Sequence, residues 1–351
     1  MENILNLSHD ELILRLNEIG QPKFRANQIW NWMFKRGVFD FYAMSNVPKS
    51  LRQRLGNIFF VELPKIHTVK KSTDGTIKFA LELFDNNLIE TVLIPESTHY
   101  TQCLSSQVGC ALKCSFCSTG KMGFIRNLEP FEILGQILIA RKYLSSTKDK
   151  LKIRNLVFMG MGEPLLNWEN VKKALYVIRH KQGLEFSYRH TTISTVCIPR
   201  PLMEFATQDL GSIAISLHAP NQLLREEIMP RAAKIIELQE LISLLSNIPM
   251  RSRQRITIEY ILIGGVNDSI EHARELNRVL SGVKCKINLI KFNPGPDIEY
   301  RPPRDEDVLA FEEFLRQKGQ ITTLRKSRGQ DISAACGQLR AEIVSKQNQG
   351  D

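Results

Sequence analysis

Three cysteines lie close together in the segment Cys110-Ala-Leu-Lys-Cys114-Ser-Phe-Cys117. A structural zinc site is closed by four ligands, and a [4Fe-4S] cluster usually has four thiolate ligands as well. Three thiolates on such a cluster leave one iron open, and an open iron can bind a small molecule and act on it. The alternative is a zinc knuckle that takes Cys103 or a histidine as its fourth ligand.

A further cysteine lies near the C-terminus, in the segment Ser333-Ala-Ala-Cys336-Gly337-Gln. Small and polar neighbours predict a loop in which the thiol is accessible and able to act as a nucleophile. A cation on Arg325, Lys326 or Arg328 would stabilise its thiolate, which is the reactive form. The alternative is a buried cysteine that acts as a small hydrophobic residue.

Polar residues also follow several predicted strands. After residues 155–159 comes Gly160-Met-Gly162-Glu163, where glycine allows backbone to approach a ligand and the carboxylate can accept hydrogen bonds from an ammonium group. Taken singly, such residues are more often caps or turns. Their shared position at strand ends makes them candidates for one binding site; the later ones are Ser194, Ser216, His218 and Asn293.

Strands and helices alternate from about Cys103 onward. Apolar runs predict strands at residues 155–159, 191–198, 212–217, 255–263, 286–292 and 320–325. A first strand is expected at residues 103–109, directly before the cysteine motif. Helical patterns fall between them at residues 129–144, 170–180, 235–245, 269–280 and 305–318. This order predicts an α/β fold, a partial (β/α) barrel whose reactive groups gather at the C-terminal ends of the strands.

Two smaller units precede the barrel. Residues 1–60 predict a helical domain that contacts RNA through its interleaved lysines and arginines; the alternative is a helical bundle with a solvated basic face. Residues 61–102 predict a short β extension with turns at Asp74-Gly75 and at residues 85–87. The barrel with its C-terminal cysteine occupies residues 103–340, and residues 341–351 form a polar tail.

The composition limits the classes of protein that remain. The chain has 351 residues, a formal net charge of +10 and 43% hydrophobic residues, which suit a globular protein with a polyanionic partner such as RNA. No apolar run approaches the roughly 18 residues that span a bilayer. The odd count of 7 cysteines favours ligation and thiol chemistry over a disulfide framework. We therefore expect a soluble, cytoplasmic protein without a membrane partner.

The motifs together resemble those of the bacterial RNA (adenine-C2) methyltransferases of the RlmN/Cfr type, in the radical S-adenosylmethionine (SAM) superfamily. The resemblance extends from about Gln21 to Leu339. Cys110, Cys114 and Cys117 match the ligands of the superfamily's [4Fe-4S] cluster, and Phe116 matches the position that packs beside the adenine of SAM. The segment around Cys336 is the most specific match, because the wider superfamily lacks it.

The resemblance implies a radical methyl transfer. One SAM methylates Cys336, and a second SAM, bound to the cluster, yields a radical that takes hydrogen from the S-methyl group. The methylene radical adds to the adenine carbon. Cys103 then releases the product by forming a transient disulfide with Cys336, and Glu90 accepts the ring proton. Without the resemblance, Glu90 would be interpreted as a surface charge on a strand.

The resemblance also implies the SAM contacts, which are Gly162, Glu163, Ser194, Ser216, Leu217, His218 and Asn293. The chain departs from the family after Ser194-Thr195, where Val196-Cys197 stands in place of the usual Ser-Gly. We expect Cys197 to be a buried strand residue and Cys285 to be structural.

The implied substrates are adenosines of 23S ribosomal RNA and of the tRNA anticodon loop, with a cytoplasmic electron donor and a monomeric enzyme. Two alternatives are open. A related C8-adenosine methyltransferase uses the same cysteines, although Gly-Met-Gly-Glu-Pro-Leu-Leu-Asn and Ser-Leu-His-Ala-Pro resemble the C2 branch more. The more distant alternative is a zinc-containing RNA-binding protein without catalytic activity.

Overall fold

One mixed sheet organises the protein, for which a computed structural model describes residues 1–147, 149–251, 253–295 and 298–340. The predicted polar tail, 341–351, lies outside the described residues. Within them the sheet has 10 strands in the order β14-β13-β12-β11-β10-β9-β6-β5-β4-β3. The pairs from β6 to β14 are parallel, and those from β3 to β6 are antiparallel.

The strands of this sheet are β3 (Lys65–Lys71), β4 (Ile77–Glu82), β5 (Leu88–Pro95), β6 (Tyr100–Cys103), β9 (Ile153–Phe158), β10 (Thr191–Thr195), β11 (Ser212–Ser216), β12 (Ile256–Leu262), β13 (Cys285–Lys291) and β14 (Thr322–Arg325). Two small sheets pair β1 (Glu2–Asn3) with β2 (Phe59–Phe60) and β7 (Gln107–Gly109) with β8 (Phe124–Asn127). The α-helices are α1 (His9–Glu18), α2 (Phe24–Trp30), α3 (Lys49–Ile58), α4 (Ser118–Met122), α5 (Pro130–Ser145), α6 (Trp168–Arg179), α7 (Pro199–Gln208), α8 (Gln222–Ile228), α9 (Pro230–Ile235), α10 (Leu238–Asn247), α11 (Ile270–Val279) and α12 (Asp305–Gln317).

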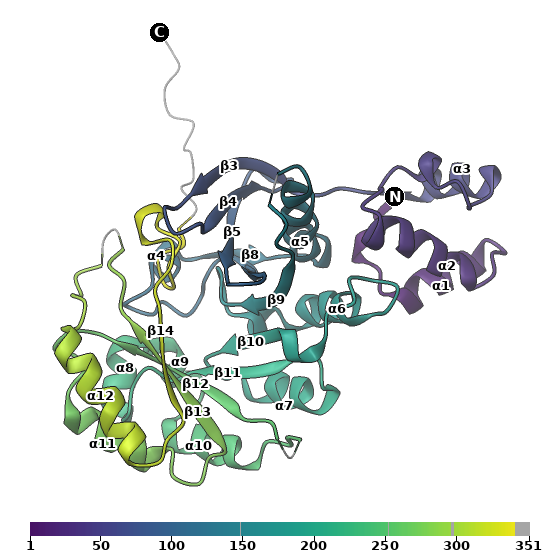
Figure 1. Cartoon of the computed structure of the whole chain (residues 1–351). Helices are drawn as coiled ribbons and strands as arrows, with labels where there is room; N and C mark the ends of the chain where they lie inside the picture. Colours follow the sequence, from purple (N-terminus) through teal and green to yellow (C-terminus); the bar gives the residue numbers. More distant parts are fainter. Residues whose placement is uncertain (148, 252, 296–297, 341–351) are drawn as a thin grey trace.

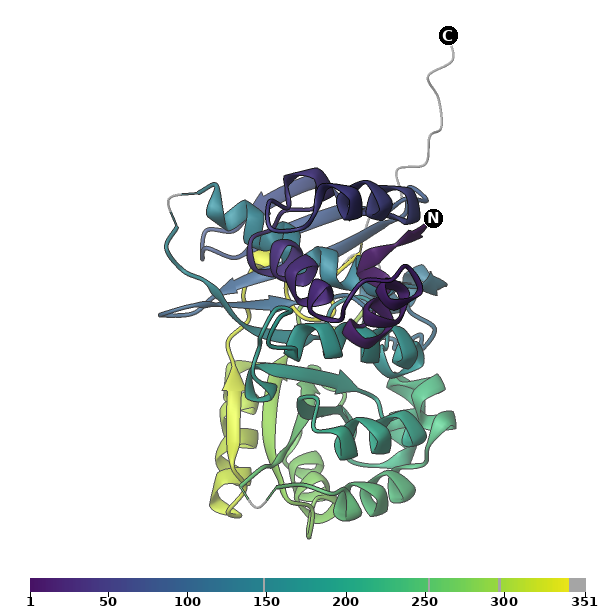
Figure 2. The ribbon, with the colours of Figure 1, turned by 90° about the vertical axis from the view of Figure 1, so that its right-hand side faces the viewer.

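The parallel strands and their connecting helices form a curved, open βα array (Figures 1 and 2). This confirms the predicted partial barrel, and each predicted helix overlaps an observed one.

Sequence reasoning missed the short helices α4, α8 and α9 and the helix α7. The last begins with Pro-Arg-Pro at Pro199, which three residues separate from the end of β10 and which directly follows the predicted strand 191–198, so its two prolines indicate the end of a strand rather than the start of an amphipathic helix.

The first barrel strand was wrongly placed. It is β6, which ends at Cys103, whereas residues 107–109 form β7 in a separate hairpin. The backbone leaves the sheet at Ser105, whose N–H donates to the side chain of Gln136 at 2.8 Å. Burial is continuous from Gln102 to Gly109 and includes the polar Ser105 and Ser106, so no exposed turn residue marks the break between the two short strands.

Helix α5 lies between the sheet and the N-terminal helices (Figure 1). Glu129 caps it reciprocally with Glu132, and Pro130 occupies its first turn. Arg126 donates two hydrogen bonds of 2.8 Å to the buried carboxylate of Glu132, which compensates that charge. Because α5 is covered on both sides, it is apolar around most of its circumference.

The N-terminal helices pack around a small apolar core that includes Leu12, Trp30 and Leu55. Ser8 and Glu11 form a capping box at the start of α1. The unit meets the barrel through the stacked rings of His9 and His180, with centroids 4.4 Å apart. None of the helices in the described ranges has the length and hydropathy that crossing a bilayer requires.

The turn before the cysteine motif depends on Gly109. Its φ is +73°, and a Cβ built there lies 1.8 Å from the carbonyl oxygen of Gly123. That carbonyl accepts the N–H of Cys110 at 2.8 Å, so the two glycines close the base of the cysteine segment.

Gly109→Ala therefore must displace this hairpin as well as strain the backbone. We expect it to lower the melting temperature measurably more than Gly282→Ala; domains of roughly 150–250 residues lose about 2–4 °C per kcal/mol, and this longer chain loses less for the same free energy. Gly282 is a matched control because its φ is +88° and its Cβ meets nothing within 4 Å. Equal melting temperatures for the two variants, measured by circular dichroism, would contradict this account of the turn.

Candidate active site

Two adjoining cavities lie at the C-terminal ends of the parallel strands. The cluster cavity, about 150 Å³, is lined by Cys110, Cys114, Cys117 and the ends of β9 to β12. The thiol cavity, about 380 Å³, is lined by Cys103, Asn293, Lys326 and Arg328 among others. Four residues line both cavities; they are Met159, Ile290, Arg325 and Cys336.

The three cysteines of the motif face one cavity because neighbouring segments hold their loop. Ser115 N–H donates to the carbonyl of Ile228 at 3.0 Å, and Arg231 donates to the carbonyl of Ala111 at 2.8 Å. Burial raises the pKa of Cys110 to about 12 and that of Cys114 well above its ordinary value, and the neighbouring thiols add to both. Buried thiolates here require a strongly cationic partner.

The donor set fits a [4Fe-4S] cluster better than a zinc ion. In the described ranges, no three His, Cys, Asp or Glu side chains are grouped closely enough to hold a single metal ion. The zinc alternative takes Cys103 or a histidine as its fourth ligand. Cys103 lines only the thiol cavity, and the histidine of the cluster cavity, His218, already accepts the N–H of Ile261. Three thiols spread around one cavity are the arrangement that a larger centre with one open iron would need.

Gly162 and Glu163 lie at the end of β9, against Gln107. Gly162 has φ +95°, and a Cβ there would be 2.5 Å from the Cβ of Gln107, so only glycine fits. The Glu163 carboxylate accepts the N–H groups of Leu165 and Val196, both at 3.0 Å. Burial nevertheless raises its pKa to about 7. A cationic group in the cavity would favour the charged form.

Ser194 and Ser216 meet across neighbouring strands, with their hydroxyl oxygens 3.2 Å apart. Ser194 also donates to Oε2 of Glu259 at 2.6 Å, while the buried Oε1 of Glu259 has no partner. An acceptor left open in this way suits an N–H or O–H of a bound ligand. Sequence reasoning missed Glu259, although a glutamate within the apolar strand Ile256–Leu262 was a detectable signal.

The remaining predicted SAM contacts occupy different places. His218 lines the cluster cavity and accepts the N–H of Ile261 at 3.1 Å; burial lowers its pKa to about 3, so the ring is neutral. Leu217 lies in the apolar core and lines neither cavity. Asn293 lines the thiol cavity and accepts a hydrogen bond from Gln330 at 2.5 Å.

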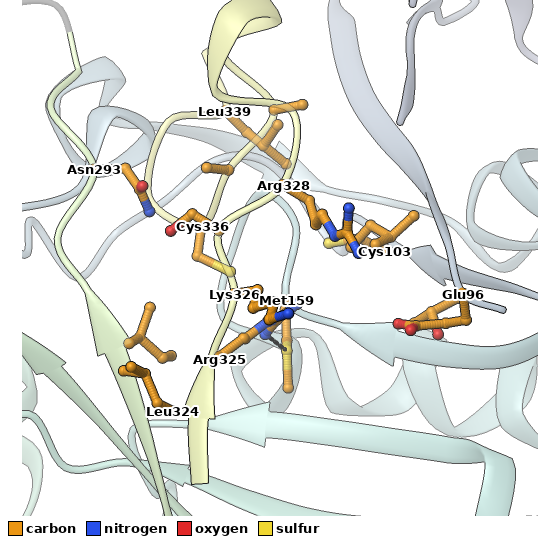
Figure 3. A pocket seen from close by; sticks show the side chains of 16 residues that line it. Glu96, Cys103, Met159, Asn293, Leu324, Arg325, Lys326, Arg328, Cys336 and Leu339 are labelled. Carbon is orange, nitrogen blue, oxygen red and sulfur yellow. Dashed lines mark hydrogen bonds between the residues drawn. The ribbon is translucent and has the colours of Figure 1, made fainter. Parts of the chain in front are cut away.

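Cys336 belongs to a loop of residues 329–340, called here the cysteine loop. Helix α4 anchors it: Ser118 N–H donates to the carbonyl of Gly337 at 2.8 Å, and Thr119 donates to that of Leu339 at 2.6 Å. These bonds hold Cys336 beside the cluster cavity while it also lines the thiol cavity. Figure 3 shows Cys103 and Cys336 entering the thiol cavity from different elements.

Cys103, one of the two candidate reactive thiols, lies in a buried environment with one nearby cation. Cys103 is 7% exposed, and burial raises its pKa to about 12, while the cation of Arg325 opposes the rise. Arg325 donates to the sulfur of Met159 at 3.4 Å, the contact drawn in Figure 3. Of the three basic residues considered from the sequence, Arg325 alone lines both cavities, whereas Lys326 and Arg328 line the thiol cavity.

Glu90 is buried, not a surface charge. The residue is 4% exposed, its Oε1 lies 2.9 Å from Nζ of Lys78, and its Oε2 accepts the N–H of Arg340 at 3.0 Å. It lines neither cavity, but it shares a face of the sheet with Cys103, because Val92 pairs directly with Cys103.

The backbone is strained within Val196-Cys197, where the chain was expected to depart from its family. Cys197 is buried as expected, but it follows β10 rather than belonging to it, and its φ is +79°. Residues other than glycine rarely adopt this conformation, so the backbone is strained at Cys197. Cys285, also predicted to be structural, is buried in β13 and 4% exposed.

Fold and site together define a radical SAM enzyme, and the comparisons agree. The family described as Radical SAM superfamily matches residues 104–276, and the one described as Ribosomal RNA large subunit methyltransferase N-terminal domain matches residues 2–61. A crystal structure of a radical SAM methyltransferase from Sphaerobacter thermophilus superposes with a TM-score of 0.90 and 38% identity, over 97% of this chain and 100% of that one.

Two relatives of known class show to which family within this superfamily the chain belongs. The dual-specificity RNA methyltransferase RlmN of Solidesulfovibrio magneticus is 50% identical over 97% of both chains. That of Lawsonia intracellularis is 46% identical over 99% of this chain and 98% of its own. The chain belongs to the RlmN family of radical SAM RNA methyltransferases. The expected enzyme class is confirmed, and with it a [4Fe-4S] cluster and SAM as cofactors.

The environment of Cys103 makes a prediction about its alkylation. With a pKa of about 12, its thiolate fraction rises about tenfold per pH unit, so iodoacetamide labelling should climb from about pH 7 to about pH 10 without levelling. Arg325→Met should slow labelling at every pH, because the opposing cation is lost. The rates are measured by peptide mass spectrometry. A labelling rate that levels off near pH 8.5, which is about the pKa of a free cysteine, would show that burial does not raise the pKa of Cys103.

Proposed function

We propose that this enzyme methylates C2 of adenosine in 23S ribosomal RNA and in the anticodon loop of tRNA, with Cys336 as carrier of the one-carbon unit. The observation that carries the proposal is the position of Cys336. It is the one cysteine that lines both the cluster cavity and the thiol cavity within the described residues. A group on its sulfur is therefore accessible to a cofactor on one side and to a nucleobase on the other.

The chemistry of the target requires such a carrier. C2 of adenine lies between two ring nitrogens and is electron-poor, so it does not attack the electrophilic methyl group of SAM. A carbon-centred radical can add to it. The bound cluster and SAM supply the 5′-deoxyadenosyl radical that activates the S-methyl group of Cys336. We propose two SAM molecules per turnover, one as methyl donor and one as radical source.

The protein's own residues complete the transfer. Glu90 accepts the ring proton, and the Cys103 sulfur bonds to the Cys336 sulfur as the bond from that sulfur to the methylene carbon breaks. The unpaired electron of the adduct would return to the cluster, which supplied one electron for cleavage of SAM. Disulfide formation then removes two electrons from the cysteine pair, which balances the overall two-electron reduction of SAM to 5′-deoxyadenosine and methionine. The methylene carbon gains a proton and becomes the methyl group, and a cellular dithiol restores both cysteines.

The three cysteines Cys110, Cys114 and Cys117 would hold the cluster. Gly162, Glu163, Ser194, Ser216, His218 and Asn293 would contact SAM through side chains or exposed backbone, and Leu217 through its backbone. Glu259 joins this set through its free Oε1. The Glu163 carboxylate would accept hydrogen bonds from the ammonium group of SAM. The positive charge of that group would compensate the buried carboxylate.

RNA would reach the site along basic surfaces. Lys326 is exposed beside the thiol cavity, and its cation suits a phosphate of the target strand. We also propose that residues 1–60 contact the RNA, through Lys23, Arg25, Lys49, Arg52 and Arg54. An adenine splayed from its stack would present its C2 edge to Cys336. The enzyme would act as a monomer in the cytoplasm, with an electron donor from that compartment.

Nucleoside mass spectrometry tests the reaction. Ribosomal RNA and tRNA incubated with reconstituted enzyme, SAM and reductant should contain 2-methyladenosine. Finding 8-methyladenosine instead would identify the C8 alternative. Finding neither, with an intact cluster and 5′-deoxyadenosine produced, would overturn the proposal.

Removal of the second thiol should trap an intermediate. Cys103→Ala leaves radical addition intact but removes the sulfur that releases the product, so we expect RNA covalently bound through Cys336. The adduct is measured as a slower band on denaturing gels that nuclease digestion removes. Cys285→Ala is the matched control, since Cys285 is equally buried but lines neither cavity. Normal turnover by Cys103→Ala would contradict its role.

A further inference from the structure

A buried lysine faces the proposed base. Nζ of Lys78 lies 2.9 Å from Oε1 of Glu90, and the two side chains are 8% and 6% exposed. A buried carboxylate is costly unless a cation and hydrogen bonds compensate it. Lys78 is the cation that the structure provides for Glu90, and no motif of the sequence indicated it.

Lys78 also contacts the cysteine loop. Its Nζ donates to the carbonyl of Ser333 at 3.1 Å, while Glu90 accepts the N–H of Arg340 at the other end of the loop. The ammonium group thus bonds both to the carboxylate and to the backbone three residues before Cys336. Each oxygen of Glu90 has a partner among the described residues, and a carboxylate oxygen can accept more than one hydrogen bond.

The sheet places this pair on the face that carries Cys103. Lys78 pairs directly with Val92, and Val92 pairs directly with Cys103, so the three side chains form a row across β4, β5 and β6. Glu90 is two residues from Val92 on the same strand and therefore on the same face. The paired strands therefore fix the position of the Glu90 carboxylate relative to the Cys103 thiol.

We propose that Lys78 is a positioning residue for the release step, which pairs with Glu90 and orients its carboxylate to take the C2 proton of the RNA adduct. The proton passes from the ring carbon to the Glu90 carboxylate, and Lys78 exchanges no proton in this step. The inference rests on the function proposed above, since it concerns the same adduct.

A purely structural role for Lys78 is the competing explanation, and other contacts of the loop argue against it. Gly329 N–H donates to Asp74 at 2.9 Å, and Ser72 donates to Asp331 at 2.6 Å. Together with the bonds from Ser118 and Thr119, these contacts anchor the loop at both ends. Loss of the single bond to Ser333 leaves them in place.

The test separates formation of the adduct from its release. Reconstituted Lys78→Gln enzyme is mixed with SAM, reductant and a tRNA substrate, and three products are followed in a single turnover: 5′-deoxyadenosine, covalent protein–RNA adduct and 2-methyladenosine. We expect 5′-deoxyadenosine and the adduct at rates within about twofold of wild type, and release slowed at least tenfold, because general base catalysis typically contributes 10²–10⁴-fold.

Two further variants provide the controls. Lys70 pairs directly with Lys78 on the neighbouring strand but is exposed, so Lys70→Gln should release product at the wild-type rate. Lys78→Arg keeps the cation and should restore release to within about threefold of wild type. If Lys78→Gln does not fold, Lys78→Arg still decides, because release as slow as that of Glu90→Gln would overturn the proposal.

Other results also overturn it. Wild-type release by Lys78→Gln means that Glu90 does not need the lysine. Loss of Cys336 methylation and adduct formation in proportion to release means that Lys78 only supports the fold. Absence of adduct and 2-methyladenosine in the wild-type reaction would instead overturn the proposed function itself.

Discussion

The hydrogen bonds between α4 and the cysteine loop are the constraint on which the site depends. Ser118 and Thr119 directly follow the last cysteine of the motif, and they bond to the backbone of Gly337 and Leu339 at 2.8 and 2.6 Å. Residues more than 200 positions apart in the chain are thereby held together. Without these bonds, Cys336 would not lie between the two cavities.

The sheet provides the second half of the arrangement. It changes from parallel to antiparallel pairing at β6, the strand that ends in Cys103. The parallel side supplies the strand ends that line the cluster cavity, and the antiparallel side supplies Glu90 and its partner Lys78. The cysteine loop crosses this junction, with contacts to Asp74 and Lys78 on one side and to Asn293 on the other. The β extension is therefore part of the site and not only a linker.

The sequence was sufficient for the class of fold and for the class of enzyme, because strand–helix alternation and cysteine spacing are local patterns. It was misleading at residues 103–109, where two short strands read as one. It could not show the pairing of Lys78 with Glu90 or the open oxygen of Glu259, since both depend on which strands become neighbours. Without the resemblance Glu90 would be interpreted as a surface charge, yet it is 4% exposed, and Glu259, which the sequence did not single out, is equally buried. Such burial becomes visible only once the sheet is assembled.

The central claim is that the sulfur of Cys336 carries the one-carbon unit to the RNA as a methylene group. Enzyme freed of prior methylation can be supplied with SAM that bears a CD3 group, and the methyladenosine formed can be weighed by mass spectrometry. The account predicts a CD2H group, because one deuterium leaves with 5′-deoxyadenosine and a solvent proton replaces it. An intact CD3 group on the product would show direct methyl transfer and would contradict the account.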